Sequence, residues 1–332
     1  MTFRSLLLRG LLPAGAILLL AVLASLLLGA GDVGPSRALS TLLGDGDSDS
    51  RFTVFHLRAP RTAVALAVGL ALGVAGTVLQ AAARNPLAEP GLLGVSTGAS
   101  FAVVIAIVLG ASAASVGPYV AVLGAGAGCL LALGAARLRG TGDDPVRLVL
   151  AGAALSGLMN AGSSVLLLSD ARAADEIRFW TIGSVAGRGT DQLLAVLPVL
   201  LLGLVLALLS GPALTALSLG DDVATGLGHK PRRARALAVT AVALLVGAAT
   251  AIAGPVSFVG LVVPFAARAL VGPDLRRLLV VSALLGPAVV LLADVASRLV
   301  ARPYEMPLGV MTALCGAPVL VAVVRSHRMP AL

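Results

Sequence analysis

Long, unbroken runs of apolar residues are the feature that most limits what this chain can fold into. Two examples are AGAILLLAVLASLLLGA at residues 14–30 and LLAVLPVLLLGLVLALL at residues 193–209. Backbone amides inside a bilayer have no water to bind, so only helices or closed barrels span it. Barrel strands alternate apolar and polar side chains, and these runs do not. The runs therefore predict an all-α polytopic membrane protein.

The composition agrees, because the chain has too few polar residues to cover a water-facing surface. It is 58% apolar and only 12% charged, whereas a soluble domain carries about 25% charged residues. The net charge of +8 would suit nucleic acid only on a soluble basic face. Here the arginines separate apolar runs, so we expect no nucleic-acid partner. Cys129 and Cys315 fall inside apolar runs and predict no disulfide framework.

Ten membrane spans are predicted within one transmembrane domain, residues 1–332. A span needs about 20 apolar residues, and we divided the chain at charges, prolines and polar clusters. The first run is longer than the apolar part of a secretory signal, so we expect it to be retained. A tight turn at Gly254-Pro255 is expected within residues 253–260. The predicted spans are 11–30, 61–81, 91–110, 118–137, 146–169, 191–210, 234–254, 256–272, 278–297 and 308–325.

The arginines also predict the orientation of the chain. Placing both termini in the cytoplasm puts most basic residues on the inner side, as the positive-inside rule requires. Residues 31–57 then form an external loop, which its Gly, Asp and Ser content marks as a flexible connector. Residues 170–190 form a second external segment, expected as a short surface helix with Trp180 at the membrane interface.

Residues 211–233 form the largest inner segment. Ser218 and Asp221 fit a capping box, and Gly228 followed by Pro231 provides a stop signal. The pattern predicts a short helix over residues 219–227. That helix is too short to span a membrane and too apolar on one side to face only water. We therefore expect it to contact a partner.

The sequence contains no motif for catalysis, nucleotide binding or metal binding. The phosphate-binding loop needs a lysine after glycine, and the only lysine, Lys230, lies in GHKPR. His56, His229 and His327 fall in separate predicted loops, and no Cys/His cluster accompanies them. We therefore expect neither enzymatic activity nor a cofactor or metal bound by this chain.

Few polar residues lie inside the predicted spans. Asn160, Ser163 and Ser164 in the fifth span are candidates for lining a pathway, because intramembrane polar groups are often functional. A hydrogen bond between helices explains them equally well. Asp294 and Arg298 lie four residues apart near the outer end of the ninth span, so they are predicted to pair on one helix face.

Glycines with a spacing of four predict close helix packing. Gly69 and Gly73 form one such pair, and Gly124 and Gly128 form another. Small residues at these intervals let helix backbones approach each other.

Several ordered blocks resemble the FecCD-type permeases of the type II ABC importers. Residues 58–99 are similar to the family pattern R-x-P-R, A-G-x-x-x-Q and N-P-L-A-x-P-x-x-L-G-x-x-x-G-A, and LSLGDDVATGLG at 217–228 is similar to its cytoplasmic loop. Residues 254–279, 291–299 and 305–319 resemble the last three spans. One position departs from the pattern, because Phe265 stands where the family typically has histidine.

The resemblance implies a cell-membrane subunit with ten helices that carries ferric siderophores, haem or vitamin B12. It implies a second permease subunit, as a homodimer or related heterodimer, with the pathway along the dimer axis. Two ATPase subunits would dock inside and carry the ATP and Mg. An extracytoplasmic substrate-binding lipoprotein or periplasmic protein would dock outside.

The resemblance also implies roles for individual residues. The short helix would couple the chain to the ATPase through Leu219, Gly220, Asp221, Ala224, Leu227 and Gly228. The turn RNPLAEP would form a rigid corner at the inner gate, built from Arg84, Asn85, Pro86 and Pro90. Docking of the binding protein would use Arg58, Arg61 and Arg298, and paired charges there would mainly orient the partner.

The resemblance favours a ferric siderophore as the cargo. Vitamin B12 and haem remain alternatives for the same type of transporter. A more remote alternative is an ion-coupled secondary transporter. That function needs intramembrane acids, and the only candidates, Asp294 and Glu305, are predicted near the outer surface.

Overall fold

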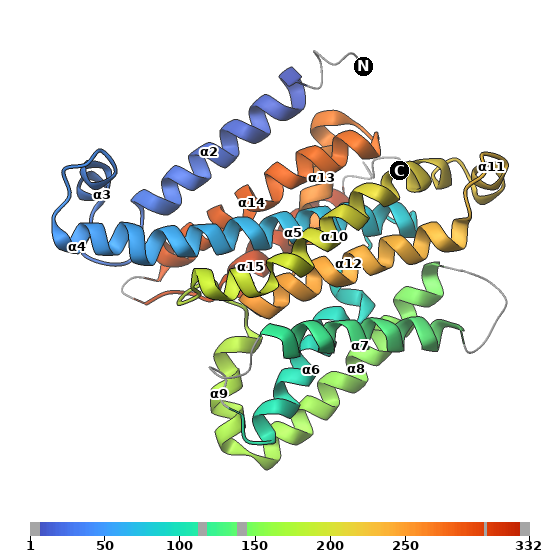
Figure 1. The fold of residues 1–332 in the computed structure, drawn as a ribbon, viewed down its shortest axis with the longest axis horizontal. Helices are drawn as coiled ribbons and strands as arrows, with labels where there is room; N and C mark the ends of the chain where they lie inside the picture. The colour runs from blue at the N-terminus through green and yellow to red at the C-terminus, as the bar shows by residue number, and fades with distance from the viewer. Residues whose placement is uncertain (1–6, 112–117, 138–144, 302–303, 326–332) are drawn as a thin grey trace.

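The computed structural model describes residues 7–111, 118–137, 145–301 and 304–325, and every regular element within them is helical (Figure 1). Seven helices are long and apolar enough to span a membrane, and three shorter apolar helices accompany them. Together they follow the ten predicted spans in order. They are α2 (Leu12–Leu27), α5 (Ala59–Ala83), α6 (Val95–Val108), α7 (Pro118–Arg137), α8 (Pro145–Ser169), α10 (Thr190–Leu217), α12 (Pro231–Ala253), α13 (Val259–Val271), α14 (Leu275–Val300) and α15 (Leu308–Arg325).

Two of the spans, α6 and α13, contain less helix than a bilayer requires. At about 1.5 Å per residue, the 14 residues of α6 cover about 21 Å of a hydrocarbon core about 30 Å thick. The short 3-10 helix η3 (Pro90–Leu93) precedes α6, and the non-helical residues 254–257 precede α13. Non-helical backbone at membrane depth is tolerated where it is buried in protein or lines a cavity.

Close backbone contacts through glycine hold the helices together. A Cβ atom at Gly69 would lie 2.5 Å from Gly286 O, and one at Gly76 would lie 1.8 Å from Gly260 O. These contacts press α5 against α14 and α13. Gly98 and Gly124 bring α6 and α7 together in the same way, since a Cβ at Gly98 would lie 2.5 Å from Gly124 O. The predicted close packing at the spaced glycines is confirmed.

The helices form two neighbouring groups. Helices α6, α7 and α8 lie together with the short helix α9 (Ala171–Thr181), below the larger group formed by α2, α5, α10 and α12–α14 (Figure 1). Helix α12 packs against α7 and links the two groups. The core is built mainly from α5, α12 and α14, whose apolar windows are largely buried.

The segment 31–57 is folded, so the prediction of a flexible connector is wrong. It forms α3 (Pro35–Leu42), α4 (Ser48–Arg51) and the π-helix η2 (Phe52–Arg58). Asp47 accepts a hydrogen bond from Ser50 N at the start of α4 and pairs with Arg37. Thr41 Oγ1 donates to Ser50 Oγ over 2.7 Å. The short polar side chains, which suggested disorder, instead cap and join these helices.

The segment 170–190 contains the predicted surface helix as α9, which Asp170 caps by accepting from Ala173 N. Trp180 is only 8% exposed, so it packs inside the protein instead of at an exposed interface position. Its carbonyl oxygen would lie 2.2 Å from a Cβ at Gly254. The Trp180 backbone therefore packs directly on the turn that precedes α13.

The segment 211–233 contains a longer stretch of α10 and a shorter second helix than predicted. Helix α10 continues through Pro212 to Leu217, and the short helix is α11 (Asp221–Gly226) instead of 219–227. The predicted capping box is wrong, because Gly220 occupies the N-cap position without a side-chain bond and Ser218 Oγ donates to Thr215 O. Gly220 has φ 116°, which allows the sharp entry into α11.

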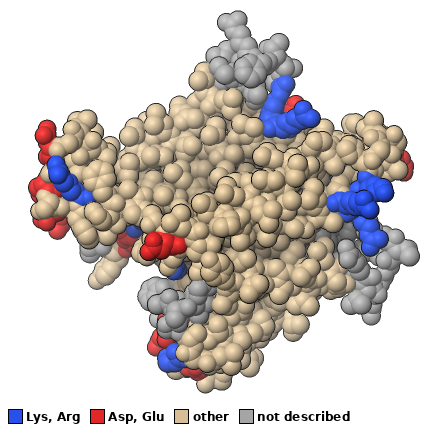
Figure 2. Space-filling model, in the orientation of Figure 1, with Lys and Arg blue, Asp and Glu red and all other residues tan. Residues whose placement is uncertain are grey.

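On the face drawn in Figure 2, charged side chains gather toward the two ends of the bundle and leave an uncharged middle. Figure 2 shows basic side chains toward the end that carries α11, acidic ones mainly at the end that carries α3 and α4, and an uncharged band between. An uncharged belt of this kind is what contact with lipid requires.

Candidate functional site

A cavity of about 950 Å³ lies between α6, α8 and α15. Its walls include the non-helical residues that shorten α6 and α13, so backbone as well as side chains face it. Hydroxyl, amide and carboxylate groups are unusually frequent here for a membrane protein. The polar residues that line it are Glu89, Ser96, Thr97, Ser100, Ser156, Asn160, Ser163, Thr181 and Ser257.

Helical spacing brings the polar groups to one side. Ser156, Asn160 and Ser163 follow at intervals of four and three, so they share one face of α8. Ser96 and Ser100 share a face of α6 in the same way. Thr97 Oγ1 and Ser156 Oγ lie 2.8 Å apart and connect the two helices. The cavity thus has a hydroxyl-rich wall made by two packed spans.

The structure places two of the three predicted pathway residues in this cavity. Asn160 and Ser163 line it. Ser164 lies outside the lining, and its hydroxyl donates to Asn160 O over 3.0 Å. A step of one residue turns a helical side chain by about 100°, which separates Ser164 from its neighbour.

Glu89 is a cavity residue that the sequence interpretation missed. Its Oε1 accepts from Phe258 N over 2.8 Å, at the start of α13. Phe258 has φ 68°, an unusual conformation for a large side chain. Pro90 packs on the same helix start, since a Cβ at Gly260 would lie 2.9 Å from Pro90 Cδ. The acid between two prolines in an apolar chain was a signal for this position.

The predicted gate residues form a compact turn between α5 and η3. Arg84 ends α5 with φ 48°, and Asn85 Oδ1 accepts from Leu87 N over 2.9 Å. Pro86 follows within the turn, and Pro90 starts η3. The turn therefore runs from the α11 end of the molecule to the cavity, which Glu89 lines.

The short helix α11 is held from one side and exposed on the other. The Asp221 carboxylate pairs with Arg84 and with Arg235, the latter at 2.9 Å. Ala224 is buried, whereas the side chains of Leu219, Val223 and Leu227 are exposed. Gly228 has φ 83° and ends the helical segment. The ion pairs fix α11 while its apolar face stays uncovered.

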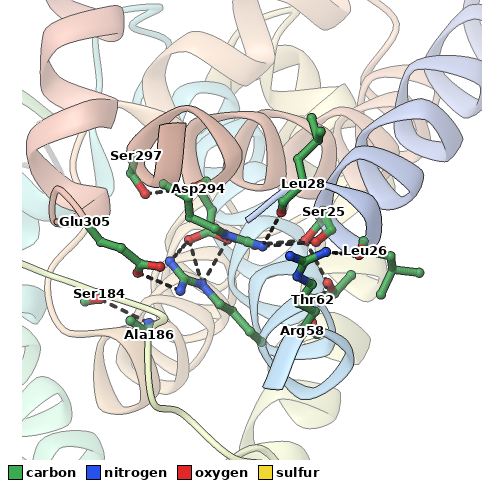
Figure 3. Close-up of polar contacts among 12 residues, drawn as sticks. Ser25, Leu26, Leu28, Arg58, Thr62, Ser184, Ala186, Asp294, Ser297 and Glu305 are labelled. Carbon is green, nitrogen blue, oxygen red and sulfur yellow. Dashed lines mark hydrogen bonds and ion pairs between the residues drawn. The ribbon is translucent and has the colours of Figure 1, made fainter. Parts of the chain in front are cut away.

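A buried charged network lies at the opposite end. Asp294 accepts from Arg61 Nη2 over 2.7 Å and from Arg298 Nε over 2.9 Å. Arg61 also pairs with Glu305 at 2.7 Å. Figure 3 shows the Asp294 carboxylate facing this cluster, with Glu305 on one side and Ser25 on the other. The predicted pairing of Asp294 with Arg298 is confirmed.

Arg58 and Arg298 cap the end of α2. Arg58 Nη1 donates to the carbonyl oxygens of Leu26 and Leu27, and Arg298 Nη1 donates to those of Ser25 and Leu28. The last carbonyl groups of a helix lack partners within it and attract cations. Both arginines are 5% exposed or less. The structure gives them an internal contact instead of the exposed position that docking requires.

The titratable groups of the described residues form no metal site. No group of three or more His, Cys, Asp or Glu residues with suitable geometry occurs in the part of the chain that the structure describes. In the loop between α9 and α10, burial lowers the pKa of Arg188. Hydrogen bonds from Ser50, and then from Arg37, lower the pKa of Asp47.

A bundle of ten helices with a polar cavity between charged ends defines an integral membrane transport subunit. The chain belongs to the FecCD transport family, whose profile matches residues 17–326. It is 42% identical over 311 residues to the ferric enterobactin transport system permease protein FepD of Escherichia coli, covering 93% of this chain and 92% of that protein.

Two further comparisons agree. The iron(3+)-hydroxamate import system permease protein FhuB of Bacillus subtilis is 37% identical over 320 residues, covering 96% of this chain and 83% of that protein. A solved structure described as an inward-facing ABC transporter of metal-chelate type is 30% identical, with a TM-score of 0.75 and coverage of 95% and 98%. The chain is therefore a cell-membrane permease subunit of an ABC importer.

Proposed function

We propose that this chain carries a ferric siderophore across the cell membrane. The observation that carries the proposal is the family membership over residues 17–326, together with relatives named for ferric enterobactin and iron(3+)-hydroxamate. The cavity of about 950 Å³ supports it, because it lies at the upper end of the size range of small-molecule sites. Asn160, Ser163 and neighbouring hydroxyl groups offer hydrogen bonds to a polar chelate.

A second permease subunit, a homodimer partner or a related chain, would close this cavity. Leu158 and Leu168 on α8 and Leu314 on α15 are exposed beside the cavity-lining residues. Lipid could cover these leucines but not the polar groups of the cavity beside them, because polar groups facing hydrocarbon are costly, so a protein neighbour is favoured on that side. The pathway would then run between the two subunits, and the whole chain, residues 1–332, acts as one transmembrane domain.

The end that carries α11 would face the cytoplasm, and both chain termini would lie there. The arginines at this end support the orientation through the positive-inside rule. Leu219, Gly220, Asp221, Ala224, Leu227 and Gly228 would form the contact to one of two ATPase subunits. ATP and Mg would be bound by those subunits, and this chain would hydrolyse nothing itself.

The opposite end would receive the substrate-binding lipoprotein or periplasmic protein. Of the three predicted docking arginines, Arg61 is the best placed to meet it, because its side chain is 13% exposed and that of its partner Glu305 is 32% exposed. Arg58 and Arg298 would support that surface from beneath by holding the end of α2. ATP binding and hydrolysis would then shift the paired subunits between two states, each stabilised by different partners.

An uptake assay with the reconstituted complex tests this function. The permease, its ATPase and its binding protein are placed in proteoliposomes, with ferric enterobactin, a ferric hydroxamate, haem and cobalamin as labelled probes. We expect ATP-dependent uptake of a ferric siderophore. Uptake of haem or cobalamin alone would contradict the cargo, and uptake driven by a proton gradient without ATP would contradict the importer mechanism.

The coupling role of α11 has its own test. Leu227→Asp places a charge on the exposed apolar face and should abolish co-purification of the ATPase while the helical content stays the same. Leu43→Asp is the matched control, because Leu43 is equally exposed but lies at the opposite end, after α3. Loss of the ATPase from both variants, or from neither, would contradict the assignment.

A further inference from the structure

A second cavity, of about 860 Å³, lies at the α11 end of the molecule. It is enclosed by the end of α10, the end of α13 and the start of α14, which meet near α11 (Figure 1). It is distinct from the polar cavity between α6, α8 and α15, because the two share no lining residue. None of the residues proposed above to line the transport pathway or to contact the ATPase lines it, although Arg84 of the gate turn does.

Arg268 in α13 is the residue that makes this cavity unusual. The residue is only 5% exposed, and it lines the cavity. Its Nε and Nη1 atoms are buried with no hydrogen-bond partner among the described residues. Its guanidinium carbon lies 5.9 Å from the centre of the Phe265 ring. A buried cation without an anion is costly, so this group requires a negative partner.

The other charges around the cavity leave it strongly positive. Arg84 and Arg277 already pair with Asp221 and Asp274 respectively. The Asp274 carboxylate also accepts from the backbone N–H groups at the start of α14, so it is not directed to Arg268. Arg276 lines the cavity and forms no ion pair within the described part of the chain. Arg268 and Arg276 therefore line the cavity without an ion pair to Asp274, the carboxylate that also lines it.

We propose that this cavity binds a phosphate-type oxyanion, held by Arg268 and Arg276. The planar guanidinium group matches phosphate oxygens in pairs of parallel hydrogen bonds. Basic pockets between spans on the cytoplasmic side bind phospholipid headgroups, and a free phosphate presents the same chemistry. The binding is independent of the transported cargo.

The test measures anion binding to the purified full-length permease dimer. One arm adds inorganic phosphate to protein in nanodiscs of phosphatidylcholine and records the unfolding midpoint. The other arm exchanges part of the lipid for phosphatidylglycerol and counts retained lipid by native mass spectrometry. The variants are Arg268→Gln and Arg276→Gln. Arg233→Gln is the matched control, because it removes an exposed arginine of α12 at the same end but outside the cavity.

We expect phosphate, phosphatidylglycerol or both to stabilise the natural protein and the control equally. Loss of a charge-assisted contact should weaken binding about tenfold or more in Arg268→Gln and less in the exposed Arg276→Gln. Retention of phosphatidylglycerol alone identifies a lipid headgroup, and a response to phosphate alone identifies a soluble anion. If Arg268→Gln does not fold, the anion binding of Arg276→Gln relative to the natural protein tests the proposal. Equal anion binding by all variants, or no binding by the natural protein, would overturn the proposal.

Discussion

Arg84 and Asp221 lie 137 residues apart in the sequence, and the structure joins their side chains in an ion pair. The same carboxylate accepts two hydrogen bonds of 2.9 Å from Arg235 Nη2. Because Arg84 ends α5 and Arg235 lies near the start of α12, Asp221 attaches α11 to two core helices at once. A displacement of α11 would therefore be transmitted to α5 and α12.

Replacing Asp221 should uncouple transport without unfolding the protein. Asp221→Asn removes the charge that both arginines share, yet exposed pairs of this kind contribute only about 0–1 kcal/mol to stability. We expect the unfolding midpoint to stay nearly constant while ATP-driven uptake falls several-fold. Asp222→Asn, a neighbour that forms no ion pair in the described structure, is the control. Equal loss of uptake in both variants would refute the role of the ion pairs that Asp221 forms with Arg84 and Arg235.

Removing the Asp294 carboxylate, at the end opposite α11, should instead destabilise the fold. The Asp294 side chain is 1% exposed and neutralises two arginines, Arg61 and Arg298. Asp294→Asn leaves Arg298 inside the protein without an anion and Arg61 with Glu305 alone, and breaking a buried pair in this way costs about 3–5 kcal/mol. We expect a large drop in the free energy of unfolding, measured by thermal or denaturant unfolding in detergent.

The exposed acid Asp32 provides the comparison for that measurement. Asp32→Asn removes the same charge from the same end of the molecule, where Asp32 is open to solvent. Its stability should equal that of the natural protein within about 0.5 kcal/mol. If Asp294→Asn is equally harmless, the network does not hold α2, α5 and α14 together.

A single methyl group at the helix contact should also be disruptive. In Gly76→Ala the new Cβ would lie 1.8 Å from Gly260 O, so α5 and α13 must separate. Overpacking of this kind typically costs about 1–3 kcal/mol. In Gly126→Ala nothing lies within 4 Å of the new Cβ, and alanine favours the helix. The unfolding midpoint should fall in the first variant and stay equal or rise in the second; a rise in both would contradict the contact.

The segment that carries α3, α4 and η2 should loosen in acid. The pKa of Asp47 lies below its ordinary value of 3.8 because Ser50 and Arg37 donate hydrogen bonds to the charged carboxylate. A lowered folded-state pKa stabilises the fold above the ordinary pKa, and this stabilisation is lost as the pH falls through the lowered value. The protection of residues 35–58 against hydrogen exchange, measured relative to the intrinsic exchange rate at each pH, should therefore fall below pH 3.8. Asp47→Asn should show low protection at neutral pH and no further loss of protection in acid.

The ten spans were predictable because each lies in an apolar run bounded by charges, prolines or polar clusters, although only seven of the described helices are long and apolar enough to cross a membrane. The pairing of Asp294 with Arg298 was also local, since the two residues lie one helical turn apart. The participation of Arg61 was not, because 233 residues separate it from Asp294. For the same reason the contact of Glu89 with Phe258 could not be read from either segment alone.

The errors of sequence interpretation share a physical cause. Polar residues such as Thr41 and Ser50 read as loop formers when considered singly, but their side chains bond to each other. Trp180 was assigned to the membrane interface by residue type, whereas the residue is only 8% exposed and its backbone packs on the turn at Gly254. Arg58 was expected at a docking surface. The sequence around Arg58 does not reveal that its side chain caps carbonyl groups at the end of α2, 31 and 32 residues earlier in the chain.

The glycine contacts between α5, α13 and α14 determine where the protein can bend. Helix backbones that touch without intervening side chains leave no space for the helices to rotate against each other. Helices α5, α13 and α14 should therefore behave as one rigid unit. The shape change of a transport cycle is then confined to the contacts around this rigid unit, chiefly where α6 and α7 pack against α12. A crosslink within the rigid unit should leave turnover intact, whereas one across the contact with α12 should stop it.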